Sequence, residues 1–132
     1  MNPSTQFATN HVVRILIVED DQDSSLFYKT ALEDSGFYVH VYNDPLEALS
    51  KFKPNFYDLL LIDIRMPKLN GFKLFQMLRK RDVKFMVCFM TAFELYYEAM
   101  VENYPSLKDT CFIRKPISKK DLIKIVRKVL LE

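Results

Sequence analysis

Five short apolar runs alternate along the chain with amphipathic segments, and no other feature of the sequence restricts the fold as strongly. This alternation is typical of a parallel sheet that helices cover on both faces. We therefore predict an α/β fold. The expected strands are Val12 to Val18, Phe37 to Tyr42, Asp58 to Asp63, Lys84 to Met90 and Asp109 to Arg114.

The second run differs from the other four, which are almost continuously apolar. In an extended chain its side chains point alternately to opposite faces. One face would carry Phe37, Val39 and Val41, and the other would carry Tyr38, His40 and Tyr42. Such alternation indicates a strand that is half exposed to water, so we expect Phe37 to Tyr42 at an edge of the sheet.

Capping residues mark three of the expected helix starts. Asp44 precedes Pro45, Asn70 precedes an apolar-periodic run, and Ser118 is followed by Asp121 at the capping spacing. In the last helix the apolar residues recur at helical spacing and leave the basic residues mainly on the outer, solvated side. The apolar set is Leu122, Ile123, Val126, Val129 and Leu130, and the basic set is Lys119, Lys120, Lys124, Arg127 and Lys128.

Length and charge narrow the classes of protein. A chain of 132 residues fits one domain, and a net charge of +2 is too small to indicate a nucleic-acid partner. The most apolar stretches, Leu59 to Ile62 and Phe85 to Met90, are far shorter than the roughly 20 residues of a membrane helix. We therefore expect neither a nucleic acid nor a membrane as partner.

The start of the chain is polar and lacks the basic and apolar regions of a secretory signal, so we expect a cytoplasmic protein. We interpret residues 1–11 as a disordered or loosely attached extension and residues 12–132 as the folded domain.

Cys88 and Cys111 both lie in apolar segments, where free cysteines behave as small buried hydrophobes. With only two cysteines, free thiols in a reducing compartment are the favoured expectation.

Polar residues follow the expected strands where each one ends. In an open parallel sheet the binding crevice lies outside these carboxyl ends. The residues there are Glu19, Asp20 and Asp21 after the first strand, Asp63 ending the third, Thr91 after the fourth and Lys115 after the fifth. Clustered carboxylates repel one another unless a cation neutralises them, and oxygen ligands without histidine or thiolate favour Mg²⁺.

The same set suits phosphoryl chemistry. Lys115 offers a positive charge and Thr91 a hydroxyl donor, and both match phosphoryl oxygens. A carboxylate can accept a phosphoryl group as an aspartyl phosphate, which makes Asp63 the candidate nucleophile.

The segment from Asp63 to Gly71, with the sequence DIRMPKLNG, resembles the phosphoacceptor loop of response-regulator receiver domains. The likeness extends to Glu19 and Asp20 after the apolar run Ile15 to Val18, to Thr91 before a small Ala92, and to Lys115 before Pro116. It covers the chain from about Val13 to Leu131 and is closest to the single-domain, chemotaxis-Y-like kind. The resemblance implies a flavodoxin-like, doubly wound (βα)5 three-layer sandwich with strand order 2-1-3-4-5.

The resemblance also implies a role for each residue of the site. Asp63 would be phosphorylated, Asp20 and Asp63 would bind Mg²⁺ directly, Glu19 would bind it through water, and Arg65 would offer its backbone carbonyl. Lys115 would pair with the phosphorylated carboxylate, Thr91 and Phe112 would be the switch residues, and the peptide bond before Pro116 would be cis.

As partners, the family implies a sensor histidine kinase or histidine phosphotransfer protein and a downstream protein target. The target would bind the surface made by the fourth helix, the fifth strand and the fifth helix. Tyr96, Tyr97 and Tyr104, around the fourth helix, are either core residues or part of this surface. A monomer or a weak, phosphorylation-dependent dimer is expected, and the only catalysis would be of its own phosphorylation and dephosphorylation.

Three other functions remain as alternatives. A haloacid-dehalogenase-like phosphohydrolase would need a second Asp two positions after the nucleophile, where this chain has Arg65. A flavin or nucleotide binder would need a glycine-rich loop, which Gly36 and Gly71 alone cannot form. A receiver-like domain that is never phosphorylated would not need the intact set of acids, Thr and Lys.

His11 and His40 lack neighbours at metal-ligand spacing and are expected at surface or edge positions.

Overall fold

The computed structural model describes residues 11–92, 102–103 and 110–131. Five parallel strands form one sheet in the order β2-β1-β3-β4-β5. The order is the expected one, and β2 lies at an edge as its alternating sequence predicts. The strands are β1 (Arg14–Val18), β2 (Tyr38–Tyr42), β3 (Leu59–Asp63), β4 (Met86–Thr91) and β5 (Cys111–Arg114).

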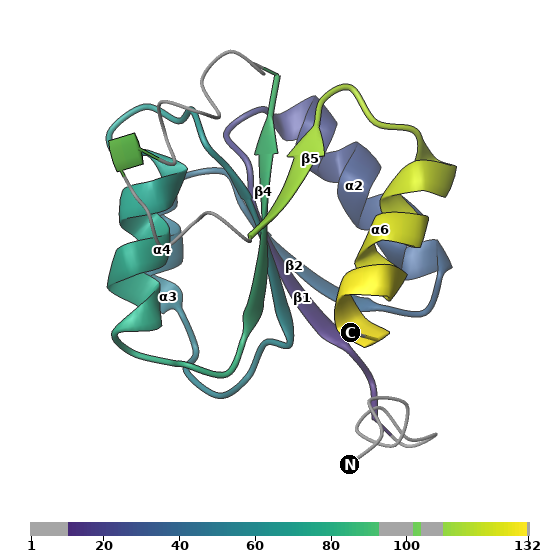
Figure 1. Ribbon diagram of the computed structural model, residues 1–132, viewed down its shortest axis with the longest axis horizontal. Coiled ribbons are helices and arrows are strands. Elements are labelled where there is room, and N and C mark those ends of the chain that lie inside the picture. Colours follow the sequence, from purple (N-terminus) through teal and green to yellow (C-terminus); the bar gives the residue numbers. More distant parts are fainter. Residues whose placement is uncertain (1–10, 93–101, 104–109, 132) are drawn as a thin grey trace.

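Helices cover both faces of the sheet, which confirms the three-layer α/β sandwich (Figure 1). They are α2 (Gln22–Asp34), α3 (Pro45–Lys51), α4 (Gly71–Arg79) and α6 (Lys119–Leu131). Figure 1 shows α3 and α4 on one side of the sheet and α2 and α6 on the other. Among the described helices, none combines the length and the apolar character needed to cross a membrane.

Some expectations concern residues outside the described ranges. They are the N-terminal extension up to residue 10, most of the fourth helix between β4 and β5, and the three tyrosines Tyr96, Tyr97 and Tyr104.

The three expected caps are present, and each fixes where a helix begins. The Asp44 carboxylate accepts a hydrogen bond from Leu46 N at 2.9 Å, with Pro45 in the first turn. The Asn70 side chain accepts one from Lys73 N at 3.0 Å. Ser118 Oγ accepts one from Asp121 N at 3.1 Å. These side chains satisfy backbone N–H groups that the first turn of a helix leaves without partners.

The two hydrophobic layers differ in composition. Aromatic rings are more numerous in the layer under α3 and α4, where Phe89 contacts Phe72, Phe75 and Phe112 at ring-centroid distances of 4.8, 5.5 and 5.7 Å. Aliphatic residues dominate the layer under α2 and α6. The last helix buries Leu122, Val126 and Leu130 there and exposes its basic residues, as predicted.

The structure overturns the expectation of two free thiols, because it pairs Cys88 with Cys111 in a disulfide. The two residues are opposite each other in the register of β4 and β5, with Cα atoms 4.6 Å apart. That spacing is within the range a disulfide can bridge. The sequence separation of 23 residues gave no sign of this neighbourhood, which arises only when the two strands pair.

Candidate functional site

Three carboxylates meet at the carboxyl end of the sheet. Glu19 and Asp20 follow β1, and Asp63 ends the neighbouring strand β3. Their carboxylate oxygens lie within 4.8 Å of one another, an arrangement that could hold a metal ion. Glu19 is fully buried, Asp63 is 6% exposed, and Asp20 is open to solvent. The cluster thus has two buried members and one exposed member. A hydrated ion could reach it from the side of Asp20.

Asp21, the third consecutive acid, has a different task. Its carboxylate caps α2 by accepting hydrogen bonds from Ser24 N at 3.1 Å and from Ser24 Oγ at 2.5 Å. The hydrogen bond from the Ser24 hydroxyl, followed by that from its backbone N–H, lowers the pKa of Asp21. Its side chain is therefore engaged by the helix, and the cluster of three acids does not include it. The cap separates the three consecutive acids into a structural one and two that face Asp63.

Lys115 lies just after β5 and reaches across to the acids. Its Nζ is 2.5 Å from Glu19 Oε1 and 3.4 Å from Asp63 Oδ1. Its backbone N–H donates to the Thr91 carbonyl at 2.8 Å, and the Lys115–Pro116 peptide bond is cis. Burial acts to lower the pKa of Lys115, but the hydrogen bond to Glu19 and the charges of Asp63 and Glu19 outweigh it and raise the pKa. Lys115 is therefore a firmly protonated counter-charge to the two buried acids.

The electrostatics of Asp63 are unfavourable to its own charge. Burial, and then the nearby charge of Glu19, raise the pKa of Asp63 to about 8, although Lys115 acts in the opposite direction. One ammonium group therefore does not compensate two buried carboxylates. A carboxylate in this state is stabilised by any further positive charge placed beside it. The site has the chemistry of a cation-binding pocket.

The loop after Asp63 turns back against the site. Ile64 N donates to the Met90 carbonyl at 3.0 Å, and Gly71 N donates to the Ile64 carbonyl at 2.9 Å. Lys68 has a φ of 73°, in the left-handed region. At Gly71 a Cβ atom would collide with the carbonyl oxygen of Asp63 and lie 3.0 Å from Ile64 Cα. The start of α4 therefore packs directly on the backbone of the acidic residue, which only glycine permits.

Arg65 is exposed on this loop, directly beside the acidic cluster in sequence. The expected contribution of its backbone carbonyl to a metal site stays a prediction.

Thr91 lies on β4, the strand next to β3, and Phe112 lies on β5, the strand beyond β4. Thr91 is the last residue of β4 and is 9% exposed. Phe112 pairs with Phe89 in the register of β4 and β5, and its ring is half-buried against Phe72 and Phe89, at centroid distances of 6.4 and 5.7 Å. Thr91 therefore lies at the same end of the sheet as the acids, while Phe112 connects this end to the aromatic layer.

The family model of the response regulator receiver domain matches residues 15–127 of the chain. The chain belongs to this family. Its members are signalling modules of two-component systems rather than enzymes of the usual kind, and they bind Mg²⁺ at an acidic pocket. They interact with histidine kinases or phosphotransfer proteins.

Among curated relatives, the response regulator receiver protein CpdR of Brucella abortus is 30% identical over 118 residues, which cover 89% of this chain and 97% of CpdR. The transcriptional regulatory protein RprY of Bacteroides fragilis is 33% identical over 110 residues, which cover 83% of this chain and 46% of RprY. The chain thus spans about half the length of RprY and of several other relatives it matches.

Solved structures agree with this family. The receiver domain of HemR from Leptospira biflexa is 30% identical with a TM-score of 0.78, covering 89% of this chain and 94% of that one. A CheY-like receiver domain protein from Methanospirillum hungatei is 28% identical with a TM-score of 0.80, covering 91% and 94%. The similarity extends over nearly the whole of each domain.

Proposed function

We propose that this domain accepts a phosphoryl group on Asp63 and passes the signal on by changing its protein contacts. The donor would be a phosphohistidine of a sensor histidine kinase or histidine phosphotransfer protein. The observation that carries this assignment is the set formed by Asp63, Glu19 and Lys115. It holds a buried carboxylate whose pKa is raised to about 8 beside a protonated ammonium group.

The metal in this proposal is Mg²⁺, held directly by Asp20 and Asp63, through water by Glu19, and by the Arg65 backbone carbonyl. All-oxygen ligands with an open, exposed side match the preferences of this ion, which retains several waters. When bound, Mg²⁺ neutralises the acids and shields the oxygens of the incoming phosphoryl group.

In the transfer step a carboxylate oxygen of Asp63 attacks the phosphorus atom of the phosphohistidine. As the new P–O bond forms, the P–N bond breaks, and the imidazole leaves with the electron pair of that bond and takes up a proton. Lys115 shifts its hydrogen bonding from Glu19 toward the new phosphoryl oxygens. The Thr91 hydroxyl donates to another of these oxygens.

The output is a rearrangement of β5 and the surface around it. A phosphoryl group adds about −1.5 to −2 charges and strong acceptor oxygens. Thr91 turns toward it, and Phe112 moves into the space that Thr91 leaves. The downstream protein then distinguishes two states of one surface, made by the helix expected between β4 and β5 together with β5 and α6. Phosphorylation only shifts the populations of two existing states.

We also place the domain in the cytoplasm, as a monomer or as a dimer that forms weakly on phosphorylation. Its catalysis is confined to its own phosphorylation and dephosphorylation. Size-exclusion chromatography with and without a phosphoryl mimic tests the oligomeric part.

The central test is phosphotransfer followed by chemical identification of the product. The purified chain with Mg²⁺ is incubated with acetyl phosphate or a phosphorylated histidine kinase, and intact mass is measured. We expect one added phosphoryl group that hydroxylamine removes, because an acyl phosphate is labile to this nucleophile and a phosphoserine is not. A hydroxylamine-stable adduct, or none with any donor while Mg²⁺ is present, would contradict the assignment.

A further inference from the structure

The paired cysteines have no part in the proposed phosphotransfer, yet they join two strands that carry its residues. Cys88 and Cys111 are opposite each other in β4 and β5. Thr91 ends the first of these strands, and Phe112 directly follows Cys111 in the second. A covalent bond here fixes β4 and β5 relative to each other next to both proposed switch residues.

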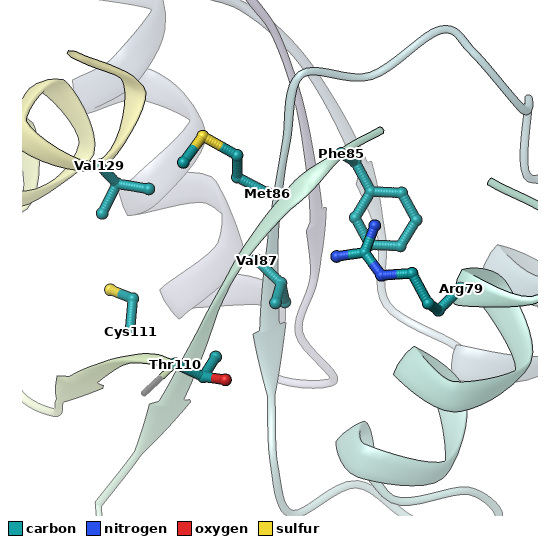
Figure 2. Close-up of a pocket in the computed structure, with 7 residues that line it drawn as sticks. All are labelled: Arg79, Phe85, Met86, Val87, Thr110, Cys111 and Val129. Atoms are coloured by element: carbon teal, nitrogen blue, oxygen red, sulfur yellow. The ribbon is translucent and has the colours of Figure 1, made fainter. Parts of the chain in front are cut away.

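The two sulfur positions differ in access. Cys88 is fully buried in the layer under α2 and α6, whereas Cys111 is only partly buried. Figure 2 shows Cys111 at the start of β5, near Val129 and Met86, where it lines a surface pocket. Solvent-borne thiol reagents therefore reach Cys111 more easily than Cys88.

The place of β5 in the sheet also favours reversible chemistry. In the described part of the chain β5 is a strand of four residues at the end of the sheet, paired with β4 alone. Short edge strands open more readily than central strands, because fewer contacts hold them. An opening of β5 gives a reductant access to the disulfide without unfolding the buried strands β1 and β3.

We propose that Cys88 and Cys111 form a reversible redox site that reacts with small disulfides such as oxidised glutathione and regulates the movement of β5. The regulatory part rests on the proposed phosphorylation of Asp63. The redox part stands without it. The oxidised form holds β5 in one position, and the dithiol form leaves it free to rearrange.

The oxidation proceeds in two exchange steps. The Cys111 thiolate attacks one sulfur of oxidised glutathione, a mixed disulfide forms, and one glutathione thiolate leaves. The Cys88 thiolate then attacks Cys111 Sγ, the protein disulfide forms, and the second glutathione thiolate leaves. The two protons of the cysteine thiols pass to solvent or to the released thiolates. Two protein thiols are oxidised and one glutathione disulfide is reduced.

The redox part is tested by equilibrating the whole chain with glutathione buffers of different redox poise, alkylating it, and measuring intact mass. We expect interconversion between a doubly alkylated form and a form without alkylation. In Cys88→Ser we expect a trapped adduct of one glutathionyl group on Cys111, and in Cys111→Ser little adduct on Cys88. Two cysteines that stay alkylatable in every buffer, or a disulfide that persists in the most reducing one, would overturn the proposal.

The regulatory part is tested by titrating beryllofluoride with Mg²⁺ into the oxidised and reduced forms, with hydrogen exchange over residues 111–117 as readout. We expect the oxidised form to bind the mimic about fivefold more weakly, within the usual range of coupling between two sites. Linkage requires that the mimic makes the disulfide easier to reduce by the same factor. Equal affinities in the two forms would refute the coupling.

The double variant Cys88→Ser/Cys111→Ser is the control and should bind the mimic equally in every glutathione buffer. If neither redox form of the natural sequence binds the mimic, the proposed phosphorylation fails, while the mass measurements still decide the redox site. If both forms bind it equally, the phosphorylation stands and only the coupling is lost.

Discussion

The two ends of β3 carry the same residue type in opposite situations. Asp58, just before the strand, accepts a hydrogen bond from Arg14 N at 2.8 Å, and its Oδ2 is 3.1 Å from His11 Nε2. Asp63, at the other end, is buried with Glu19, and its pKa is raised to about 8. The donor to Asp58 includes a fixed backbone N–H group, whereas the donor to Asp63 is the long side chain of Lys115.

A second carboxylate near the amino end of the sheet follows the same rule as Asp58. Asp82 is 4% exposed and accepts hydrogen bonds from Asn55 N at 2.8 Å and Lys84 N at 2.9 Å. Backbone N–H groups are fixed donors, so these acids serve as structural acceptors. At the carboxyl end the positive partner of Asp63 is a long side chain, Lys115, which can move away. An acid becomes available for chemistry where the fold supplies too few fixed donors.

The largest expected effect separates the two ends of β3 by chemistry. Asp63→Asn should abolish phosphoryl incorporation from acetyl phosphate with Mg²⁺, because it removes the nucleophilic oxygen. Asp58→Asn is the matched control and should incorporate one phosphoryl group as the natural sequence does. Intact mass measures both. Modification of Asp63→Asn at the natural rate would assign the phosphoryl group to another residue.

The next effect concerns folding at the amino end. Asp82→Ala leaves two backbone N–H groups without their acceptor and should lower the free energy of unfolding by about 2 kcal/mol or more. Asp34→Ala, which removes an exposed ion pair with Lys119, should change it by less than about 0.5 kcal/mol. Urea denaturation measures both. If Asp82→Ala were as stable as Asp34→Ala, the distinction between structural and available acids would be wrong.

A smaller effect separates the consecutive acids after β1. Asp20→Ala removes a proposed direct ligand and should weaken Mg²⁺ binding by about tenfold or more. Asp21→Asn is the matched control, because asparagine also caps helices, and it should bind Mg²⁺ almost unchanged. Mg²⁺ titration followed by NMR decides between them. The reverse result would move the metal site from Asp20 to Asp21.

The last effect is a pH dependence of stability, which is a slope rather than a loss at one pH. Asp63 has a folded-state pKa raised from 3.8 to about 8, so between these values the folded state binds more protons than the unfolded state. The free energy of unfolding therefore falls as pH rises through this window. Its slope corresponds to a difference of up to one bound proton between the folded and unfolded states. Asp63→Asn should lack this part of the slope, and saturating Mg²⁺ should reduce it in the natural sequence. Urea midpoints at several pH values, compared between the two proteins without Mg²⁺, measure it. Parallel curves would mean that Asp63 is not strained by its neighbours.

Much of the fold could be predicted because its causes are local. The alternating runs specify a parallel sheet, the polarity pattern places β2 at the edge, and Asp44, Asn70 and Ser118 begin helices through neighbouring backbone groups. The acids of the candidate site could also be predicted, because they lie at the carboxyl ends of the expected strands.

What the sequence did not reveal depends on contacts between distant segments. The third strand begins at Leu59, one residue after the expected start, and the carboxylate of Asp58 accepts a hydrogen bond from Arg14 N in the neighbouring strand. Lys115 lies closer to Glu19 than to Asp63, since the two acids compete for a single ammonium group. The pairing of Cys88 with Cys111 likewise depends on strand register.

The two glycines of this chain should tolerate mutation very differently. Gly36 has a φ of 91° but open space around the position of a Cβ, so asparagine, which visits left-handed backbone angles, is a tolerable replacement there. At Gly71 the obstacle is the Asp63 carbonyl itself, and no choice of side chain avoids it. In a library of random variants selected for soluble expression and Mg²⁺ binding, position 36 would thus accumulate substitutions while position 71 stayed invariant. The steric limit set by the Asp63 peptide group would thus appear in the selected sequences as a position that accepts glycine alone.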